Sequence, residues 1–202
     1  MKKIIKYYFS PMSCWTYLGH ERFHKITKDA EAEVIFKPFD PLRLFAAAGG
    51  LPLAQRPLQR QKYRLIELNR WKSYLNSPIT IEPKFFPYDP RAASLAIVAT
   101  NNLYGQEKAM LVTQKLLEGC WVHEKDMSST EEINNCLENC SLDIGKITRA
   151  TQQADVIGSY DKNTDDAIND DVFGAPTFLI DGEPFWGQDR LDFVERKLNE
   201  RL

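Results

Sequence analysis

YYFSPMSCWTYLG, residues 7–19, contains a change of hydrophobic period. It continues a nearly unbroken apolar run that starts at Lys2, and such a run is typical of a strand buried on both faces. Further on, the apolar residues recur at helical spacing, at Trp15, Leu18, Phe23 and Ile26. Ser10, Pro11 and Ser13 lie between the two patterns, and serine is a preferred helix N-cap. The stretch therefore predicts a buried strand, a turn and an amphipathic helix capped by Ser13.

The predicted cap places the Ser13 hydroxyl where a helix leaves a buried strand. Unpaired N–H groups and the helix dipole favour negative charge at such a point. A thiolate or alkoxide held there is stabilised, so Ser13 is a candidate catalytic residue. The alternative interpretation is a serine that only caps the helix.

Composition excludes several classes of protein. The chain has 202 residues, 43% of them hydrophobic and 27% charged, which suits a globular protein with a full core. A formal net charge of −2 with both signs interspersed gives no basic surface for nucleic acid. We see no leader sequence and no apolar run long enough to span a membrane, so we expect a cytoplasmic protein. Its four cysteines form no C-x-x-C pair, and we expect no disulfide framework.

The order of the remaining patterns predicts the architecture. Residues 32–39 form a second strand pattern, and helical periods then dominate from 42 to 170. Strand patterns return at 177–181 and 184–186, joined by an Asp-Gly turn, before a final helix at 189–202. The series β-α-β, helical block, β-β-α describes an α/β chain with a thioredoxin-like fold and an inserted all-helical domain.

The same patterns predict the domain boundaries. We assign residues 1–41 and 171–202 to the thioredoxin-like domain and residues 42–170 to the helical insertion domain. Within the insertion we predict helices at 42–48, 58–75, 91–101, 107–120, 143–153 and 154–168, and another that opens at 128–132.

A second candidate site lies in VFGAPTFLIDGEPFWGQDR, residues 172–190. Pro176 precedes a strand, where a cis bond is expected to turn the backbone of Ala175 outward for a bound peptide. At the other end, the Trp186–Asp189 segment precedes a helix, with N–H groups for a carboxylate and the Asp189 side chain for an ammonium. The alternative is a strand start followed by an aspartate N-cap.

His20-Glu21-Arg22-Phe23-His24 spells the H-E-x-x-H pattern of zinc sites. No motif supplies a third ligand, and the charged Arg22 does not suit the buried helix of a metalloprotease. We therefore expect no metal, and interpret the two histidines as solvent-exposed. Cys136 and Cys140 fall on one helical stripe and are expected in the core.

Taken together, these motifs resemble those of 2-hydroxychromene-2-carboxylate isomerases and kappa-class glutathione transferases, in the DsbA-like branch of the thioredoxin superfamily. The resemblance covers nearly the whole chain, and VFGAPTF…DG…FWGQDRL is its most specific part. These families carry S-P-x-S where disulfide oxidoreductases have C-P-x-C. Two alignments fit: Ser10-Pro11-Met12-Ser13 matches the letters, whereas an alignment on Ser13 matches Tyr17-Leu18-Gly19 without a gap. We prefer Ser13 as the active serine.

The resemblance implies a glutathione-dependent isomerase acting on an aromatic or conjugated organic acid by reversible thiolate addition. Ser13 is implied to hold the glutathione thiolate. The other implied glutathione-binding residues are Ala175, Pro176, Trp186, Gly187, Gln188 and Asp189. The implied substrate-binding residues are Gln55, Arg56 and Tyr88. A homodimer is implied because relatives commonly form one, with no nucleic acid or membrane as partner.

Three positions depart from the family pattern and leave other functions open. Phe45 replaces a lysine, Gly50 an asparagine, and Cys14 a proline. The alternatives are a kappa-type glutathione transferase or peroxidase, and a DsbA-like thiol oxidoreductase that uses Cys14. A non-catalytic glutathione- or peptide-binding module is a third alternative, and a zinc hydrolase a fourth.

Overall fold

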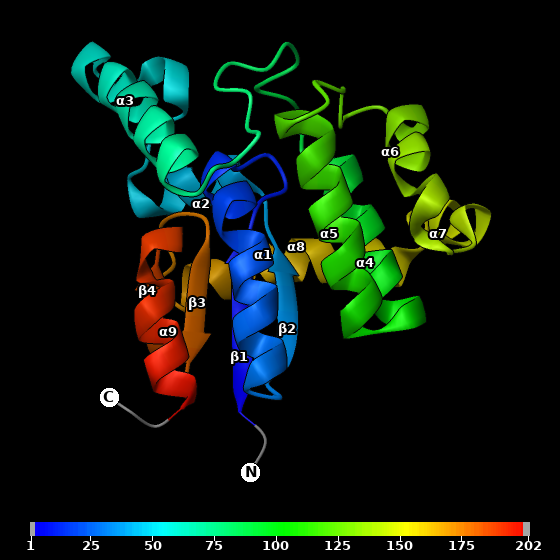
Figure 1. Cartoon of the computed structure of the whole chain (residues 1–202). Coiled ribbons are helices and arrows are strands. Elements are labelled where there is room, and N and C mark those ends of the chain that lie inside the picture. The colour runs from blue at the N-terminus through cyan, green and yellow to red at the C-terminus, as the bar shows by residue number, and fades with distance from the viewer. Residues whose placement is uncertain (1–2, 200–202) are drawn as a thin grey trace.

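A computed structural model describes residues 3–199 of the chain. The described residues form a sheet in the order β2-β1-β3-β4 (Figure 1). Strand β1 (Ile4–Phe9) pairs in parallel with β2 (Glu33–Pro38) and antiparallel with β3 (Thr177–Ile180), which continues into β4 (Glu183–Trp186). The predicted start of the first strand at Lys2 and the predicted end of the last helix at 200–202 lie outside the described residues.

Strand β1 is buried on both faces, as its unbroken apolar run predicts. Ile5, Tyr7 and Phe9 belong to the main hydrophobic core, whereas Tyr8 belongs to a second cluster with Phe39, Leu44, Ala167, Val172 and Leu179. Successive side chains of a strand point to opposite faces, so one strand contributes to both cores. This double burial makes β1 the centre of the molecule.

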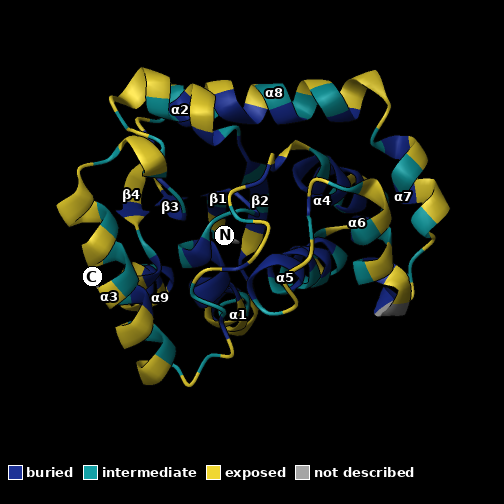
Figure 2. Ribbon diagram, turned by 90° about the horizontal axis from the view of Figure 1, so that it is seen from above, coloured by how far each residue is buried: buried dark blue, intermediate teal, exposed yellow. Residues whose placement is uncertain are grey.

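Helices cover both faces of the sheet (Figure 2). Helices α1 (Cys14–Asp29) and α9 (Leu191–Leu198) lie on one face, and α8 (Ala154–Asn169) and α2 (Pro41–Ala48) on the other. The inward residues predicted for the last helix, Leu191, Val194 and Leu198, are all buried. The thioredoxin-like architecture predicted from the order of elements is confirmed.

The remaining helices lie between β2 and β3 in the sequence, where the sequence predicts a helical block. They are α3 (Leu58–Tyr74), α4 (Arg91–Tyr104), α5 (Gln106–Trp121), α6 (Thr130–Leu137) and α7 (Ile144–Ala150), with the short 3-10 turns η1 (Leu53–Gln55) and η2 (Glu138–Cys140). A third 3-10 turn, η3 (Gln188–Arg190), follows β4. Helices α4 and α5 pack on each other and on β2, and their apolar residues join the core cluster of β1. Helix α3 stands apart at the end of the molecule that carries the first turn of α1, and Leu68 is its one buried residue.

Several predicted details need correction. The helix expected at 143–153 ends at Ala150, and the last α-helix begins at Leu191 because the 3-10 turn η3 precedes it. Cys140 is buried as expected, but Cys136 is only half-buried. Within residues 3–199, no helix combines the length and apolarity that crossing a membrane requires.

The interpretation of both H-E-x-x-H histidines as solvent-exposed is wrong for His20, which is 1% exposed. Its Nδ1 lies 3.1 Å from the Tyr7 hydroxyl and its Nε2 lies 3.0 Å from the Met110 carbonyl oxygen. His24 is half-buried and contacts Glu107 instead. Both ring nitrogens of His20 therefore contact polar groups within the core. His20 helps to pack α1 against β1 and α5.

Candidate active site

Ser13 caps α1 as predicted. Its backbone is extended, with φ −79° and ψ 123°, and its Oγ accepts a hydrogen bond from the Thr16 N–H at 3.2 Å. The same hydroxyl donates to the Ala175 carbonyl oxygen at 3.4 Å. The Ala175–Pro176 peptide bond is cis, also as predicted. The turn after β1 and the segment before β3 thus meet at the first turn of α1.

The two candidate serines have different surroundings. Ser10 is 2% exposed, and its carbonyl oxygen accepts the Ser13 N–H at 2.9 Å. Ser13 is half-buried and stands at the helix N-terminus, where the macrodipole favours an anion. Ser13 is therefore the more accessible of the two serines.

Two glycines allow the segment after β4 to approach this helix. A Cβ on Gly19 would lie 2.6 Å from the Gln188 Cβ, so α1 and η3 pack at a distance that only glycine permits. A Cβ on Gly174 would lie 2.5 Å from Trp186 Nε1, so the indole rests on bare backbone. The Gly187 N–H donates to the Pro176 carbonyl oxygen at 2.9 Å. These contacts fix Trp186–Arg190 beside the first turn of α1.

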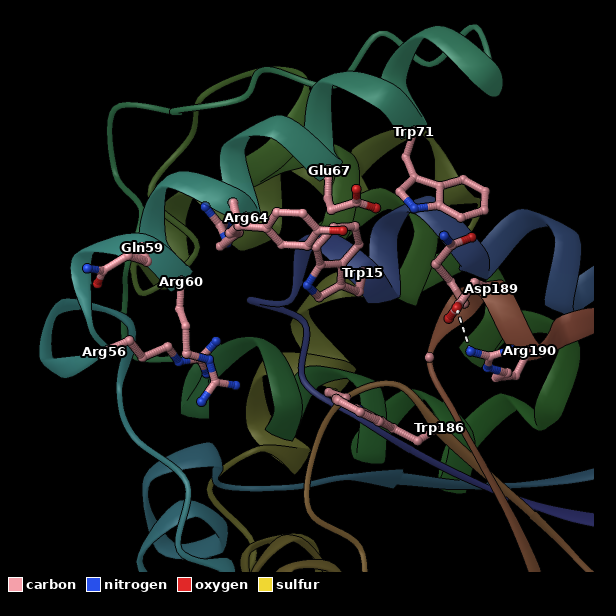
Figure 3. Close-up of a pocket in the computed structure, with 14 residues that line it drawn as sticks. Trp15, Arg56, Gln59, Arg60, Arg64, Glu67, Trp71, Trp186, Asp189 and Arg190 are labelled. Carbon is pink, nitrogen blue, oxygen red and sulfur yellow. Dashed lines mark ion pairs between the residues drawn. The ribbon is translucent and has the colours of Figure 1, made fainter.

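A cleft of about 700 Å³ opens between this segment and α3 (Figure 3). Its size falls in the range of sites for small molecules and cofactors. The lining residues are Trp15, Arg56, Gln59, Arg60, Tyr63, Arg64, Glu67, Trp71, Ala175, Trp186, Gly187, Gln188, Asp189 and Arg190. Aromatic rings and charged side chains thus share one cavity.

The structure brings most of the predicted site residues together. Ala175, Arg56 and the Trp186–Asp189 segment line the cleft. Ser13 is not among the lining residues, but it donates a hydrogen bond to one of them, Ala175. Three further predicted residues also lie outside the lining. Gln55 is exposed outside the lining, Pro176 is buried at the start of β3, and Tyr88 is 8% exposed within the core.

Sequence reasoning missed several lining residues. Arg190 pairs with Asp189 at 3.4 Å, and α3 contributes Arg60 and Arg64. The signal for the α3 residues was present, because Arg60 and Arg64 are four residues apart and share one face of the helix. From the sequence alone, this face of α3 is interpreted as solvent-exposed, and only the position of α3 over the cleft gives it a role.

Cys14 follows Ser13 but has a different environment. It is 3% exposed, and Arg64 Nη2 donates to its Sγ at 3.3 Å. Burial raises the pKa of the Cys14 thiol, and the Arg64 charge opposes that effect only in part. A buried thiol with a raised pKa is a poor nucleophile, because the thiolate is the reactive form.

Comparison with known proteins identifies the family. Residues 4–199 match the model of the DSBA-like thioredoxin domain, and the chain belongs to this family. The chain is 27% identical over 199 residues to a 2-hydroxychromene-2-carboxylate isomerase from Sphingobium xenophagum, covering 98% of this chain and 99% of that protein. It is 24% identical over 216 residues to glutathione S-transferase kappa 2 from Caenorhabditis elegans, covering 98% and 93%.

A solved structure supports the same fold. A 2-hydroxychromene-2-carboxylate isomerase (HCCA isomerase) superposes with a TM-score of 0.78 at 23% identity, covering 98% of this chain and 95% of that chain. The relatives named by sequence are an isomerase and a glutathione transferase, so the resemblance drawn from the sequence motifs is confirmed.

Proposed function

We propose that this protein is a glutathione-dependent isomerase, resembling 2-hydroxychromene-2-carboxylate isomerase, that acts on an aromatic or conjugated organic acid. The observation that carries the proposal is the meeting of three segments in one cleft: the N-terminus of α1, the backbone at Ala175, and Trp186–Arg190. The name of the relative at 27% identity supports isomerisation, and that of the relative at 24% identity supports the use of glutathione.

The donor set of the cleft fits glutathione. Its γ-glutamyl end carries an ammonium and a carboxylate, and Asp189 and Arg190 offer one partner for each. The peptide part of glutathione has the backbone of Ala175, next to the start of β3, as a hydrogen-bonding edge. Trp186, 52% exposed, supplies an apolar wall between these two points.

Ser13 then holds the cofactor sulfur. When bound, glutathione supplies a thiolate that adds reversibly to a conjugated double bond, which rotates as a single bond before the thiolate leaves. The Ser13 Oγ already accepts from Thr16, and its hydrogen is held only by the 3.4 Å contact with Ala175. That hydrogen is therefore available to a thiolate, and the α1 dipole favours the same charge.

The substrate is placed by the opposite wall. Arg56 provides a fork for one carboxylate, while the rings of Trp15, Tyr63 and Trp71 offer apolar faces to an aromatic group. The sequence places the walling role at Tyr88, but these cleft rings are better placed for it. We also propose a cytoplasmic location for the protein. Its four cysteines are free thiols, and thiols stay reduced in that compartment.

Calorimetric titration with reduced glutathione tests the cofactor. Asp189→Ala should weaken binding by more than tenfold, because the ammonium loses its counter-ion. Asp192→Ala is the matched control, since Asp192 pairs with Arg22 on the surface and should leave binding unchanged. Ser13→Ala should keep glutathione affinity within a few-fold but reduce the thiolate absorbance of the bound cofactor. Unchanged affinity in Asp189→Ala would contradict the proposal.

Kappa-type glutathione transfer or peroxidase activity is the second candidate, favoured by the kappa transferase relative. Consumption of glutathione during turnover separates it from isomerisation, which returns the cofactor. A DsbA-like oxidoreductase predicts activity lost in Cys14→Ser and kept in Ser13→Ala. The raised pKa of the buried Cys14 thiol argues against that outcome. Glutathione binding without turnover on any electrophile would indicate a binding module.

A further inference from the structure

Three arginines gather on the α3 side of the cleft. Arg56 follows η1, and Arg60 and Arg64 occupy successive turns of α3. Figure 3 shows the guanidinium groups of Arg56 and Arg60 next to each other, across the cleft from Asp189 and Arg190. We call Arg56, Arg60 and Arg64 the arginine cluster.

None of the three has a carboxylate partner among residues 3–199. Arg56 is held by neutral groups, since its Nε donates to the Leu51 carbonyl oxygen at 2.8 Å and its guanidinium lies 5.7 Å from the Phe45 ring centre. The Arg60 guanidinium has no partner within the described part of the chain. Of these two adjacent guanidinium groups, Arg56 is held in place, and neither is neutralised by a carboxylate.

Arg64 differs from the other two. It donates to Cys14 Sγ and lies 5.1 Å from the Phe86 ring centre, so its guanidinium is already engaged by groups of the protein. Burial, together with the charges of Arg60 and Arg64, lowers the pKa of Arg56. Mutual repulsion of this kind is relieved by a bound anion.

Acidic groups of the cleft do not supply that anion. Glu67 is engaged by Arg70, and Asp189 by Arg190. The lining therefore holds four arginines against two carboxylates that already have partners. One ligand carboxylate occupies one guanidinium fork and leaves the neighbouring arginine without a counter-charge.

We propose that Arg56 and Arg60 select an aromatic substrate that carries two ionised carboxylates, one for each guanidinium. The inference rests on the proposed function, which gives Arg56 one substrate carboxylate, and adds Arg60 as the residue that recognises the second. Phe45 orients Arg56. The aromatic ring of Phe45, at a position where the family carries lysine, thus takes part in recognition of the substrate. The rings of Trp15, Tyr63 and Trp71 accommodate the aromatic body of the substrate.

Calorimetry with two aromatic probes tests this selection at neutral pH, with and without saturating glutathione. Phthalate carries two adjacent carboxylates on one ring and benzoate carries one. The wild-type protein should bind phthalate at least tenfold more tightly than benzoate. Arg60→Gln should reduce this ratio to about two, mainly by weakening phthalate, because one charge-assisted contact is lost.

Two further variants make the result specific. Lys62→Gln removes a positive charge from an exposed position of the same helix outside the cleft lining, and should leave the ratio unchanged. Arg60→Lys keeps the charge without the planar fork and should give an intermediate ratio. Arg60 is exposed, so its variants should fold, which circular dichroism checks.

The outcomes separate the two proposals. Equal affinity for phthalate and benzoate in the wild type would overturn the selection of a dianion. A loss of glutathione affinity in Arg60→Gln with an unchanged phthalate ratio would assign the arginine cluster to the cofactor, and would also overturn it. Absence of glutathione binding to the wild type would overturn the proposed function alone. The ratio of phthalate to benzoate affinity, measured without glutathione, would still test the arginine cluster.

Discussion

At the scale of single residues, His20 has a defined protonation state. The Met110 carbonyl oxygen can only accept, so the Nε2 that contacts it at 3.0 Å carries the ring hydrogen. Nδ1 then accepts from the Tyr7 hydroxyl at 3.1 Å. Burial lowers the pKa of His20 to about 4, because a charged imidazole would be isolated from water. The core therefore contains a neutral histidine.

This histidine predicts how stability depends on pH. With a usual pKa near 6.5, His20 is protonated in the unfolded chain below that pH but stays neutral in the folded chain down to about pH 4. The unfolded state binds more protons in this window, so the free energy of unfolding falls as pH falls. The loss is ~1.4 kcal/mol per pH unit, or roughly 3 kcal/mol across the window. Above pH 6.5 His20 does not contribute to the pH dependence of the unfolding free energy.

Chemical denaturation of variants at several pH values checks this expectation. His20→Gln should show a shallower fall in unfolding free energy between pH 6.5 and 4 than the wild type, whatever its stability at neutral pH. His123→Gln is the control, because it removes an exposed imidazole outside the core. Identical slopes in wild type and His20→Gln would show that His20 titrates normally.

At the scale of elements, the contact between α1 and η3 builds the site. Ser13 begins α1 and Asp189 lies in η3, so the separation of these elements sets the separation of the two residues. Gly19→Ala should force the elements apart, because the added Cβ would approach the Gln188 Cβ to 2.6 Å. We expect a loss of about 1–3 kcal/mol in unfolding free energy and a weaker affinity for glutathione.

Gly158→Ala is the matched control for this substitution. Gly158 lies in α8 with nothing within 4 Å of the added Cβ, so alanine there should stabilise the protein by about 0.5–1 kcal/mol. Thermal unfolding and calorimetry of both variants make the comparison. A Gly19→Ala protein as stable as the wild type, with the same affinity, would mean that the contact does not position the site.

Helices, strands and turns were also the features that could best be predicted from the sequence. The period change at Ser13 and the cis bond at Ala175–Pro176 are confirmed because each depends on a local rule of backbone geometry. The burial of His20 was missed because its environment comes from Met110, far away along the chain. Arg60 and Arg64 were missed for the same reason, since their face of α3 becomes functional only through the tertiary position of that helix.

At the scale of the whole molecule, the boundary predicted at residues 42 and 170 does not divide the hydrophobic core. One cluster includes Tyr7 and Phe178 of the sheet together with Leu116 and Trp121 of α5. Helix α1 also packs directly on α5. If either part unfolded alone, it would expose the apolar surface that the other part buries against it. Neither part is therefore expected to open without the other.

Hydrogen exchange in low denaturant tests this cooperativity. The most protected amides of β1 and of α5 should exchange with free energies within about 1 kcal/mol of each other and with the same denaturant dependence. Helix α3 gives the internal contrast: with Leu68 as its one buried residue, its amides should exchange through a local opening of much lower free energy. Opening of α5 with a small denaturant dependence, while β1 remains protected, would show instead that the insertion unfolds as a separate domain on a stable thioredoxin-like base.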